Sequence, residues 1–305
     1  DATQGWIPTT DDDVTDAPVK YNTEGIFGYG ENGGHLGMTN LVNSSGVVAS
    51  DVTGVGTARN ALAACEYGND KGIFGFGYND SNVGMTNLVS NAGVVATDVT
   101  AVGTARRSLA ACGYGYDKGI FGFGNTDSGY TAITNLVSNA GVVATDVTGV
   151  GTVRINLGAT EYGGDKAIFG FGTTGSVTAV TNLVSNAGVV ATDTTGVGTA
   201  RDQVAACKYG NDKGIFGFGN DGSNNVGMTN LVSNAGVVAT DVTAVGTARN
   251  RLAACEYGED KGIFGFGKTT SDVDITNLVS NAGVVATDVT GVGTARRYLA
   301  ACSFN

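Results

Sequence analysis

The sequence has little proline, tryptophan or histidine: two prolines, one tryptophan (Trp6) and one histidine (His35) in 305 residues. A lone His in a Gly-rich loop is more often solvated than catalytic. The chain also contains no Gly-x-Ser-x-Gly nucleophile motif, no phosphate-binding loop and no metal-ligand spacing. Acidic residues recur in every repeat, which indicates a structural role, because the residues of a single active site would differ from their equivalents in the other repeats. The sequence therefore predicts no enzyme, no catalytic residue, no metal and no cofactor.

Positive charge is also scarce, with 17 Lys and Arg against 28 Asp and Glu and a net charge of −11. Nucleic acids and anionic membranes both require a basic surface, so neither is expected as a partner. No apolar run approaches the ~18 residues that span a bilayer.

Glycine is abundant, with 50 residues, and it falls at fixed places beside aromatic and β-branched residues. The motif Ile-Phe-Gly-aromatic-Gly begins at Ile26, Ile73, Ile120, Ile168, Ile215 and Ile263. Successive starts differ by 47, 47, 48, 47 and 48 residues. The chain thus holds six copies of one unit, and a fixed period of this length is typical of solenoids, propellers or arrays.

Each unit divides into four strand-like runs, which in the second copy are residues 60–67, 71–77, 85–90 and 94–100. Short connections with turn residues join them, and no window shows a helical apolar period. A four-stranded meander repeated six times predicts an all-β, six-bladed β-propeller with four antiparallel strands per blade. The predicted propeller is pseudo-symmetric and occupies residues 20–305.

The two ends of the repeat region are complementary. The first copy has only a degenerate first strand, whereas the chain ends in a lone first strand, Tyr298 to Cys302. We therefore expect the C-terminal strand to complete blade 1 and close the ring, which leaves no exposed sheet edge. Residues 1–19 do not match the repeat and are interpreted as an N-terminal arm or linker. Their acidic run, Asp11 to Asp13, lacks the EF-hand spacing and is interpreted as a solvated stretch.

The repeated motif suggests how blades pack. If side chains alternate along residues 73–77, Ile73, Gly75 and Gly77 share one face, while Phe74 and Phe76 share the other. Eleven of the twelve phenylalanines lie in this motif, with Tyr29 in the remaining slot. At ~1.5–3 kcal/mol for each buried ring, aromatic residues packed against neighbouring glycines would dominate cohesion between blades.

Five cysteines occupy one repeat position, and Thr160 takes the sixth place. They are Cys65, Cys112, Cys207, Cys255 and Cys302. Equivalent positions one blade apart lie beyond the ~7 Å Cα reach of a disulfide, so we expect small buried apolar side chains. A metal or redox ring is the alternative, but no CxxC pair and no accompanying His or carboxylate supports it.

The run Arg106…Leu109-Ala110-Ala111, followed by Gly119-Ile120-Phe121-Gly122-Phe123-Gly124, resembles the kelch repeat. The resemblance covers residues 20–305 six times over and implies a kelch-like propeller that acts as a scaffold. The repeat sequence TNLVSNAGVVATDVTGVGTAR is similar to repeats of environmental phage and large-virus proteins. That resemblance implies a viral setting, in the virion or the infected-cell cytoplasm, and supplies no catalytic residue.

Two places vary between the copies. One is the loop between the second and third strands. The other is the residue after the repeat Arg, which is Asn60, Arg107, Ile155, Asp202, Asn250 or Arg297. In a meander both places emerge at the same end of the blade, so the variable residues are predicted to converge on one binding face.

The repeat Arg itself belongs to the candidate binding face and occurs at Arg59, Arg106, Arg154, Arg201, Arg249 and Arg296. Near the axis these residues would form a positive ring that holds an anion or a carboxylate. The favoured alternative is that each Arg ties one blade to the next through backbone carbonyls or a repeat Asp. The candidate partners are Asp51, Asp98, Asp146, Asp193, Asp241 and Asp288.

The sequence thus predicts a monomeric, non-enzymatic scaffold that presents a variable loop face to an unidentified protein. A multivalent carbohydrate-binding propeller is the alternative, with a glycan on the same face. The repeat tyrosines, for example Tyr67, would then stack on sugars, although covering the rim of the core is the commoner use of such a residue. A single Trp weakens the glycan hypothesis.

Overall fold

The computed structural model describes residues 22–100, 102–243 and 245–305, and all regular structure in these ranges is β. The predicted arm at residues 1–19, with Trp6 and the acidic run, lies outside the described residues. Within the described ranges no helix is long and apolar enough to cross a membrane.

The strands form six small antiparallel sheets of three strands each. Sheet 1 contains β22 (Ala300–Phe304), β1 (Glu24–Glu31) and β2 (His35–Val42); sheet 2 contains β3 (Ala63–Tyr67), β4 (Lys71–Gly75) and β7 (Thr86–Val89); sheet 3 contains β8 (Ala110–Tyr114), β9 (Lys118–Gly122) and β12 (Thr134–Val137). Sheet 4 contains β13 (Gly158–Tyr162), β14 (Lys166–Gly170) and β15 (Thr181–Val184); sheet 5 contains β16 (Ala205–Tyr209), β17 (Lys213–Gly217) and β18 (Thr229–Val232); sheet 6 contains β19 (Ala253–Tyr257), β20 (Lys261–Gly265) and β21 (Thr276–Val279).

Two short hairpins lie in the loops that follow the middle strands of sheets 2 and 3. They are β5 (Tyr78–Asn79) with β6 (Ser81–Asn82), and β10 (Asn125–Thr126) with β11 (Gly129–Tyr130).

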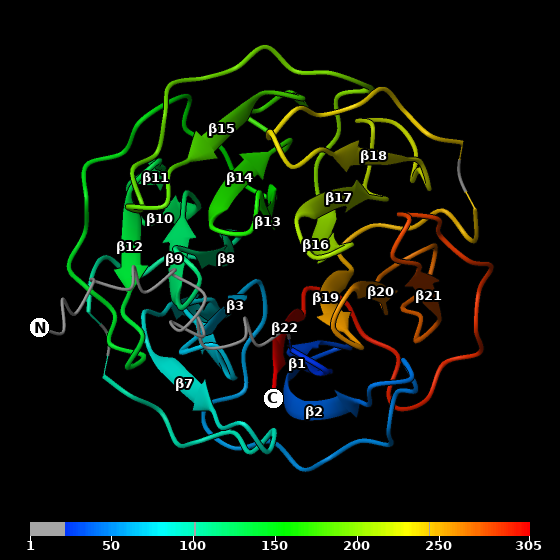
Figure 1. Ribbon diagram of the computed structural model, residues 1–305. Helices are drawn as coiled ribbons and strands as arrows, with labels where there is room; N and C mark the ends of the chain where they lie inside the picture. Colours follow the sequence, from blue (N-terminus) through cyan, green and yellow to red (C-terminus); the bar gives the residue numbers. More distant parts are fainter. Residues whose placement is uncertain (1–21, 101, 244) are drawn as a thin grey trace, which may run out of the picture.

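Figure 1 shows the sheets following one another around a common centre, with the first strand of each repeat innermost. These inner strands, β3, β8, β13, β16, β19 and β22, contact one another in that order, and β22 also contacts β3. The C-terminal strand β22 pairs with β1 from Glu24↔Phe304 to Gly28↔Ala300. The predicted pairing of the chain end with the first repeat is therefore confirmed.

The prediction of four strands in each repeat is wrong, because the fourth run is not a continuous strand. In sheet 2 the run after β7 makes only isolated bridges, Val89↔Val95 and Thr86↔Val99. The pairing register shifts by one residue between the two bridges, and the side chain of Asn87 fills the gap by donating to the carbonyl of Ala96 at 3.0 Å. The inserted amide interrupts the ladder, so each sheet has three strands and a bulged outer segment.

The predicted alternation of side chains along the motif also fails at its second aromatic residue. Phe76 has a φ of 61°, a left-handed conformation that turns the chain after β4. As a result Phe76 packs in the same core cluster as Ile73, whereas Phe74 lies in the neighbouring cluster with Tyr29. The two rings of one motif therefore face opposite neighbours, and every junction between sheets receives one ring from each side.

The predicted match between aromatic rings and glycines is confirmed. A Cβ atom added at Gly75 would lie 2.7 Å from Cζ of Phe121 in the next sheet, so the ring occupies the space that glycine leaves. The same Phe121 ring meets Phe76 edge-on, with centroids 5.2 Å apart. Equivalent contacts join Gly28 to Phe74, Gly122 to Phe169, Gly170 to Phe216, Gly217 to Phe264 and Gly265 to Phe27.

All five cysteines are buried and free, as predicted. Each inner-strand Cys packs toward the next sheet; Sγ of Cys65, for example, lies 2.5 Å from where a Cβ on Gly119 would be. Burial raises the pKa of every one of these thiols above its usual value. They serve as small apolar side chains in the junctions between sheets.

Candidate functional site

The six repeat arginines are fully buried, with no exposed surface on any of them. In sheet 4, Arg154 donates from Nε to the carbonyl of Phe171 at 3.0 Å, from Nη1 to the carbonyl of Thr152 at 3.1 Å and from Nη2 to Oδ1 of Asn182 at 2.7 Å. Burial lowers the pKa of Arg154 to about 10, which still leaves the group charged at neutral pH. The sequence allowed an anion-binding ring here, but the guanidinium groups are turned into the protein.

Each arginine also joins two sheets. Cζ of Arg154 lies 4.3 Å above the ring of Phe123, which belongs to the preceding sheet. The same stacking pairs Arg59 with Tyr29, Arg106 with Phe76, Arg201 with Phe171, Arg249 with Phe218 and Arg296 with Phe266. A desolvated cation over an aromatic face contributes up to ~2 kcal/mol, so these contacts reinforce every junction.

The repeat aspartates hold the segments that link the sheets. Asp98, in the bulged outer segment of sheet 2, accepts from the backbone N of Thr57 at 3.0 Å and from its hydroxyl at 2.7 Å. Burial alone would raise the pKa of Asp98, but the bonds from Thr57 and Asn87 outweigh it and hold the pKa below its usual value. Oδ1 of Asp98 also lies 4.0 Å from Nη1 of Arg59.

The two variable places of the repeat do converge. The residue after each repeat Arg forms a backbone bridge with the start of the variable loop in the same sheet. The bridges are Asn60↔Tyr78, Arg107↔Asn125, Ile155↔Thr173, Asp202↔Asn220, Asn250↔Lys268 and Glu31↔Arg297. We call this end of the sheets the variable face.

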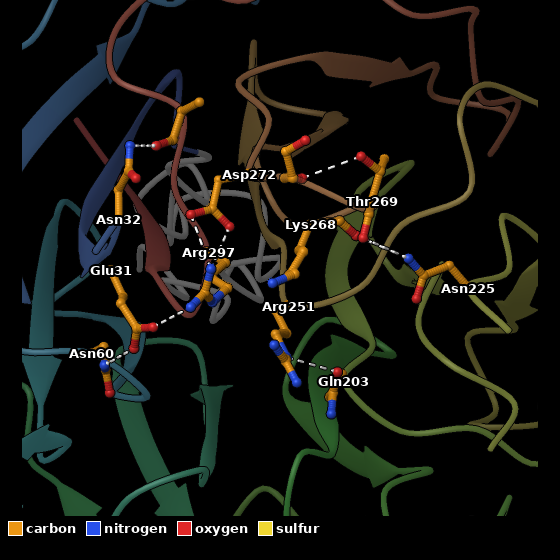
Figure 2. A network of polar contacts seen from close by, with 12 residues as sticks. Glu31, Asn32, Asn60, Gln203, Asn225, Arg251, Lys268, Thr269, Asp272 and Arg297 are labelled. Carbon is orange, nitrogen blue, oxygen red and sulfur yellow. Dashed lines mark hydrogen bonds and ion pairs between the residues drawn. The ribbon is translucent and has the colours of Figure 1, made fainter. Parts of the chain in front are cut away.

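Side chains on the variable face form a polar network between neighbouring sheets (Figure 2). Arg297 donates to Asp272 at 2.8 Å and to Glu31, which also accepts from Asn60. Burial opposes protonation, but these two carboxylates raise the pKa of Arg297 above its usual value. Farther round, Asn225 donates to the carbonyl of Lys268 at 3.1 Å.

The predicted site residues after the repeat Arg take different positions in this face. Asn60, Asp202 and Asn250 are buried, whereas Arg107 and Arg297 are partly exposed. Cζ of Arg107 lies 4.6 Å from the ring centroid of Tyr78 in sheet 2.

His35, expected to be solvated, also takes part in the network. Its Nε2 lies 3.3 Å from Oδ1 of Asp80, and its Nδ1 lies 3.3 Å from Nδ2 of Asn60. The residue therefore links sheets 1 and 2 on the variable face.

The residues at the centre of this face, two positions after each repeat Arg, are not among those predicted from the sequence. These mouth residues are Ala61, Ser108, Asn156, Gln203, Arg251 and Tyr298. The backbone N of each one donates to the carbonyl of the preceding one at 2.7–3.2 Å, and the N of Ala61 donates to Tyr298. The six bonds thus form a closed cycle at the centre.

All six mouth residues have a left-handed backbone, with φ between 51° and 57°. Such a conformation costs a non-glycine residue roughly 1–2 kcal/mol, and the chain places glycine at many other positions with positive φ. Yet no mouth residue is glycine, and no side chain occurs twice. The same conformation recurs at Phe76 and its equivalents, where the side chain is always aromatic. The combination of a strained backbone with six different side chains therefore sets the mouth residues apart from the scaffold. Aligning the repeats one position further along would have revealed this variation.

The mouth residues surround a small cavity of about 70 Å³, which we call the mouth cavity. Arg251 contacts both of its neighbours in the cycle: its Nε donates to Oε1 of Gln203 at 3.0 Å, and its Cζ is 4.6 Å from the ring centroid of Tyr298. Asn156 donates to Oδ2 of Asp202 at 3.2 Å. Burial raises the pKa of Asp202, although the Asn156 bond and the Arg251 charge oppose the shift.

A second cavity of about 40 Å³, the inner cavity, lies among the inner strands. Three consecutive repeat positions line it: the Ala before the repeat Cys, the Cys (or Thr160) itself and the residue after it. The third position contributes Glu66, Gly113, Glu161, Lys208 and Glu256, and its sixth residue, Ser303, lies outside the lining. Nζ of Lys208 is 3.1 Å from one carboxylate oxygen of Glu161 and one of Glu256. Burial, helped by the Glu161 carboxylate, raises the pKa of Glu66 to about 7.

The inner cavity is therefore acidic at its centre, but it does not form a metal centre. Among the described residues, no three His, Cys, Asp or Glu side chains are arranged to hold a metal ion together. A Cβ on Gly113 would lie 1.7 Å from Oε1 of Glu161, so a larger residue at this position would require the Glu161 side chain to move.

The opposite end of the sheets repeats almost unchanged. Tyr67, Tyr114, Tyr162, Tyr209 and Tyr257 are 3–4% exposed there, so their rings are not available for stacking on a sugar. The Asp-Lys pairs at the adjacent turns make ion pairs between sequence neighbours, such as Asp117 with Lys118 at 2.9 Å. Partly exposed pairs of this kind contribute little stability.

Comparison with known proteins does not place the chain in a family. No protein-family model matches it, and a search of curated proteins finds no match.

Proposed function

We propose that residues 20–305 form a six-bladed, kelch-like β-propeller, closed by its C-terminal strand, that acts as a monomeric and non-enzymatic interaction module. Support for the ring comes from the pairing of β22 with β1, the cyclic bonds of the mouth residues and the contact of Phe27 with Gly265. The kelch-like pattern of Arg106 and Gly119–Gly124 supports the same architecture, and the likeness to phage and large-virus repeats supports a viral setting.

The module binds a protein partner through the variable face, with the mouth cavity at its centre. One observation carries this proposal: six equivalent, left-handed positions hold six different side chains around one cavity. The scaffold positions, by contrast, hold the same Arg, Phe and Gly in almost every repeat. Variation concentrated at strained positions indicates selection for contact with something outside the chain.

A glycan is the less favoured ligand. The repeat tyrosines that would stack on sugar rings are buried beneath neighbouring turns, as Tyr67 is beneath Gly141. The mouth cavity, at about 70 Å³, accommodates one side chain rather than a pyranose ring.

Site-specific photo-crosslinking tests the proposal. A benzophenone amino acid at Ser108 reports on the mouth, and the same group at the exposed Asn139 of the opposite end is the matched control. In an extract of the source organism or its infected host, we expect one dominant protein adduct from position 108 and none from position 139. Equal labelling from both positions, or adducts with glycan alone, would contradict protein binding through the variable face.

A further inference from the structure

Most cationic side chains of this acidic protein are already neutralised or buried. Among the described residues, three are neither buried nor within ion-pair distance of a carboxylate: Arg107, Arg251 and Lys268. All three lie on the variable face. In a chain of net charge −11, the described cations that lack a carboxylate partner are thus gathered at one end of the sheets.

Two of these cations belong to sheet 6 and start from neighbouring backbone positions. The backbone of Lys268 exchanges two hydrogen bonds, of 2.8 and 3.0 Å, with Asn250, which immediately precedes Arg251. Both side chains are visible in Figure 2, beside the centre of the network. Arg107 lies in sheet 3, which does not neighbour sheet 6 in the order of inner-strand contacts, and it therefore stands apart from this pair.

The guanidinium of Arg251 is oriented by its surroundings but not fully used by them. Its Nε bond to Gln203 and its stacking on Tyr298 fix the plane of the group. No acceptor in the described part of the chain takes a hydrogen bond from its two Nη groups. A planar group held in this way is organised to donate two parallel bonds to a carboxylate.

The acidic groups near the mouth do not satisfy this demand, because other donors already hold them. Asp272 and Glu31 accept from Arg297, and Asp202 accepts from Asn156. No ion pair joins Arg251 to any of these carboxylates among the described residues.

We propose that Arg251, with the mouth residue Tyr298 beside it, binds a carboxylate that an acidic peptide segment of the partner inserts into the mouth cavity. This inference rests on the proposed function, whose partner it describes more closely. A cavity of about 70 Å³ admits a single Asp or Glu side chain. The strongly negative protein as a whole disfavours an extended polyanion, so a short acidic segment suits both the local and the overall charge.

Peptide binding tests the site directly. The probe is a fluorescently labelled hexaglutamate peptide, with hexaglutamine as the uncharged reference, in fluorescence anisotropy at low ionic strength. Arg251→Gln removes the charge and the paired Nη donors of the guanidinium. Arg251→Lys keeps only the charge, and Lys268→Gln removes the second cation. Lys118→Gln is the matched control, because it removes the same charge from the opposite end of the sheets.

We expect hexaglutamate but not hexaglutamine to bind the wild-type protein. Arg251→Gln should weaken binding by about 10-fold or more, as expected for the loss of a charge-assisted hydrogen bond. Arg251→Lys and Lys268→Gln should cause smaller losses, and Lys118→Gln should leave binding within about twofold. Equal binding of both peptides, or an equal loss in Lys118→Gln and Arg251→Gln, would overturn the site. A sulfated oligosaccharide that binds more tightly than hexaglutamate, and through Arg251, would overturn the peptide as its occupant.

The crosslinking experiment separates this inference from the proposed function. If the adduct at position 108 persists in Arg251→Gln, the interaction module stands and the carboxylate site fails. If hexaglutamate binding depends on Arg251 but no protein adduct forms, the carboxylate site stands and the protein partner fails. Circular dichroism of each variant confirms that the sheets remain folded.

Discussion

Replacing Gly75 by alanine tests the packing that we hold responsible for cohesion between the sheets. The new Cβ would lie 2.7, 3.0 and 3.3 Å from three carbon atoms of the Phe121 ring. Ordinary carbon contacts are ~3.5–4.0 Å, so the ring must retreat by roughly 1 Å. It has little room to do so, because it is completely buried and packed edge-on against Phe76 at 5.2 Å.

The expected cost is that of overpacking a core, about 1–3 kcal/mol. With an unfolding entropy of roughly 2 cal/mol/K per residue over about 300 residues, the melting temperature should fall by roughly 2–5 °C. Gly75 has no positive φ, so the backbone contributes no strain of its own. Calorimetry or chemical denaturation measures the loss.

Gly34→Ala is the matched control, because a Cβ at that position meets no atom within 4 Å and the backbone is also ordinary. The double variant Gly75→Ala with Phe121→Leu should show favourable coupling, since the smaller side chain relieves the collision. A Gly75→Ala protein that melts with the wild type, or additive effects in the double variant, would refute the proposed packing.

Four further predictions concern the buried charges, the thiols and the mouth. Arg154→Met should destabilise the fold by about 3 kcal/mol or more, because it strands two buried acceptors, the carbonyl of Phe171 and Oδ1 of Asn182, whereas Arg107→Met should change the melting temperature little. Glu66 has a raised pKa of about 7 in the folded state, so the folded protein retains a proton that the unfolded chain releases, and wild-type stability falls as pH rises from about 4.5 to 7. Glu66→Gln should therefore gain up to about 3 kcal/mol relative to the wild type by pH 8, and a difference independent of pH in urea titrations would contradict the assignment. The five cysteines should react with Ellman's reagent only after unfolding, since burial both shields them and raises the pKa of their thiols. Ser108→Gly should raise stability by up to about 1 kcal/mol by relieving the left-handed backbone, and a lower melting temperature would argue against strain at the mouth.

The repeat itself made most of the fold predictable. Period, turn residues and the stray first strand at the C-terminus predicted antiparallel units and the pairing of β22 with β1. Glycines opposite aromatic residues predicted the junctions between sheets, because only a missing Cβ leaves room for a ring.

Two local errors have physical causes that simple alternation does not include. Phe76 adopts a left-handed conformation, which period-two reasoning cannot anticipate for a non-glycine residue. The outer run after β7 looks like a strand, but the amide of Asn87 replaces part of its backbone ladder.

The candidate site was only partly predictable. The sequence located the variable face, since two variable places emerge at the same end of a meander. The sequence did not locate the mouth or the inner cavity. Which residues line each cavity depends on where the inner strand begins, and the sequence pattern does not specify that residue. Ala61 precedes β3 and lies at the mouth, whereas Glu66, five residues later, lies in the inner cavity.

Under the proposed function, the mouth residues would let a repeated scaffold bind an unrepeated partner. An asymmetric ligand could bind to six equivalent positions in six orientations of equal free energy. Restricting it to one of them costs RT ln 6 of binding free energy, about 1 kcal/mol. Six different side chains remove that degeneracy, since only Arg251 offers a fork and only Tyr298 offers a ring. The left-handed backbone sets the same starting geometry for each side chain, so their chemistry alone distinguishes the positions. Specificity at this mouth therefore depends on the order of side chains around the cycle, and exchanging Ser108 with Arg251 should move the bound carboxylate while leaving the scaffold unchanged.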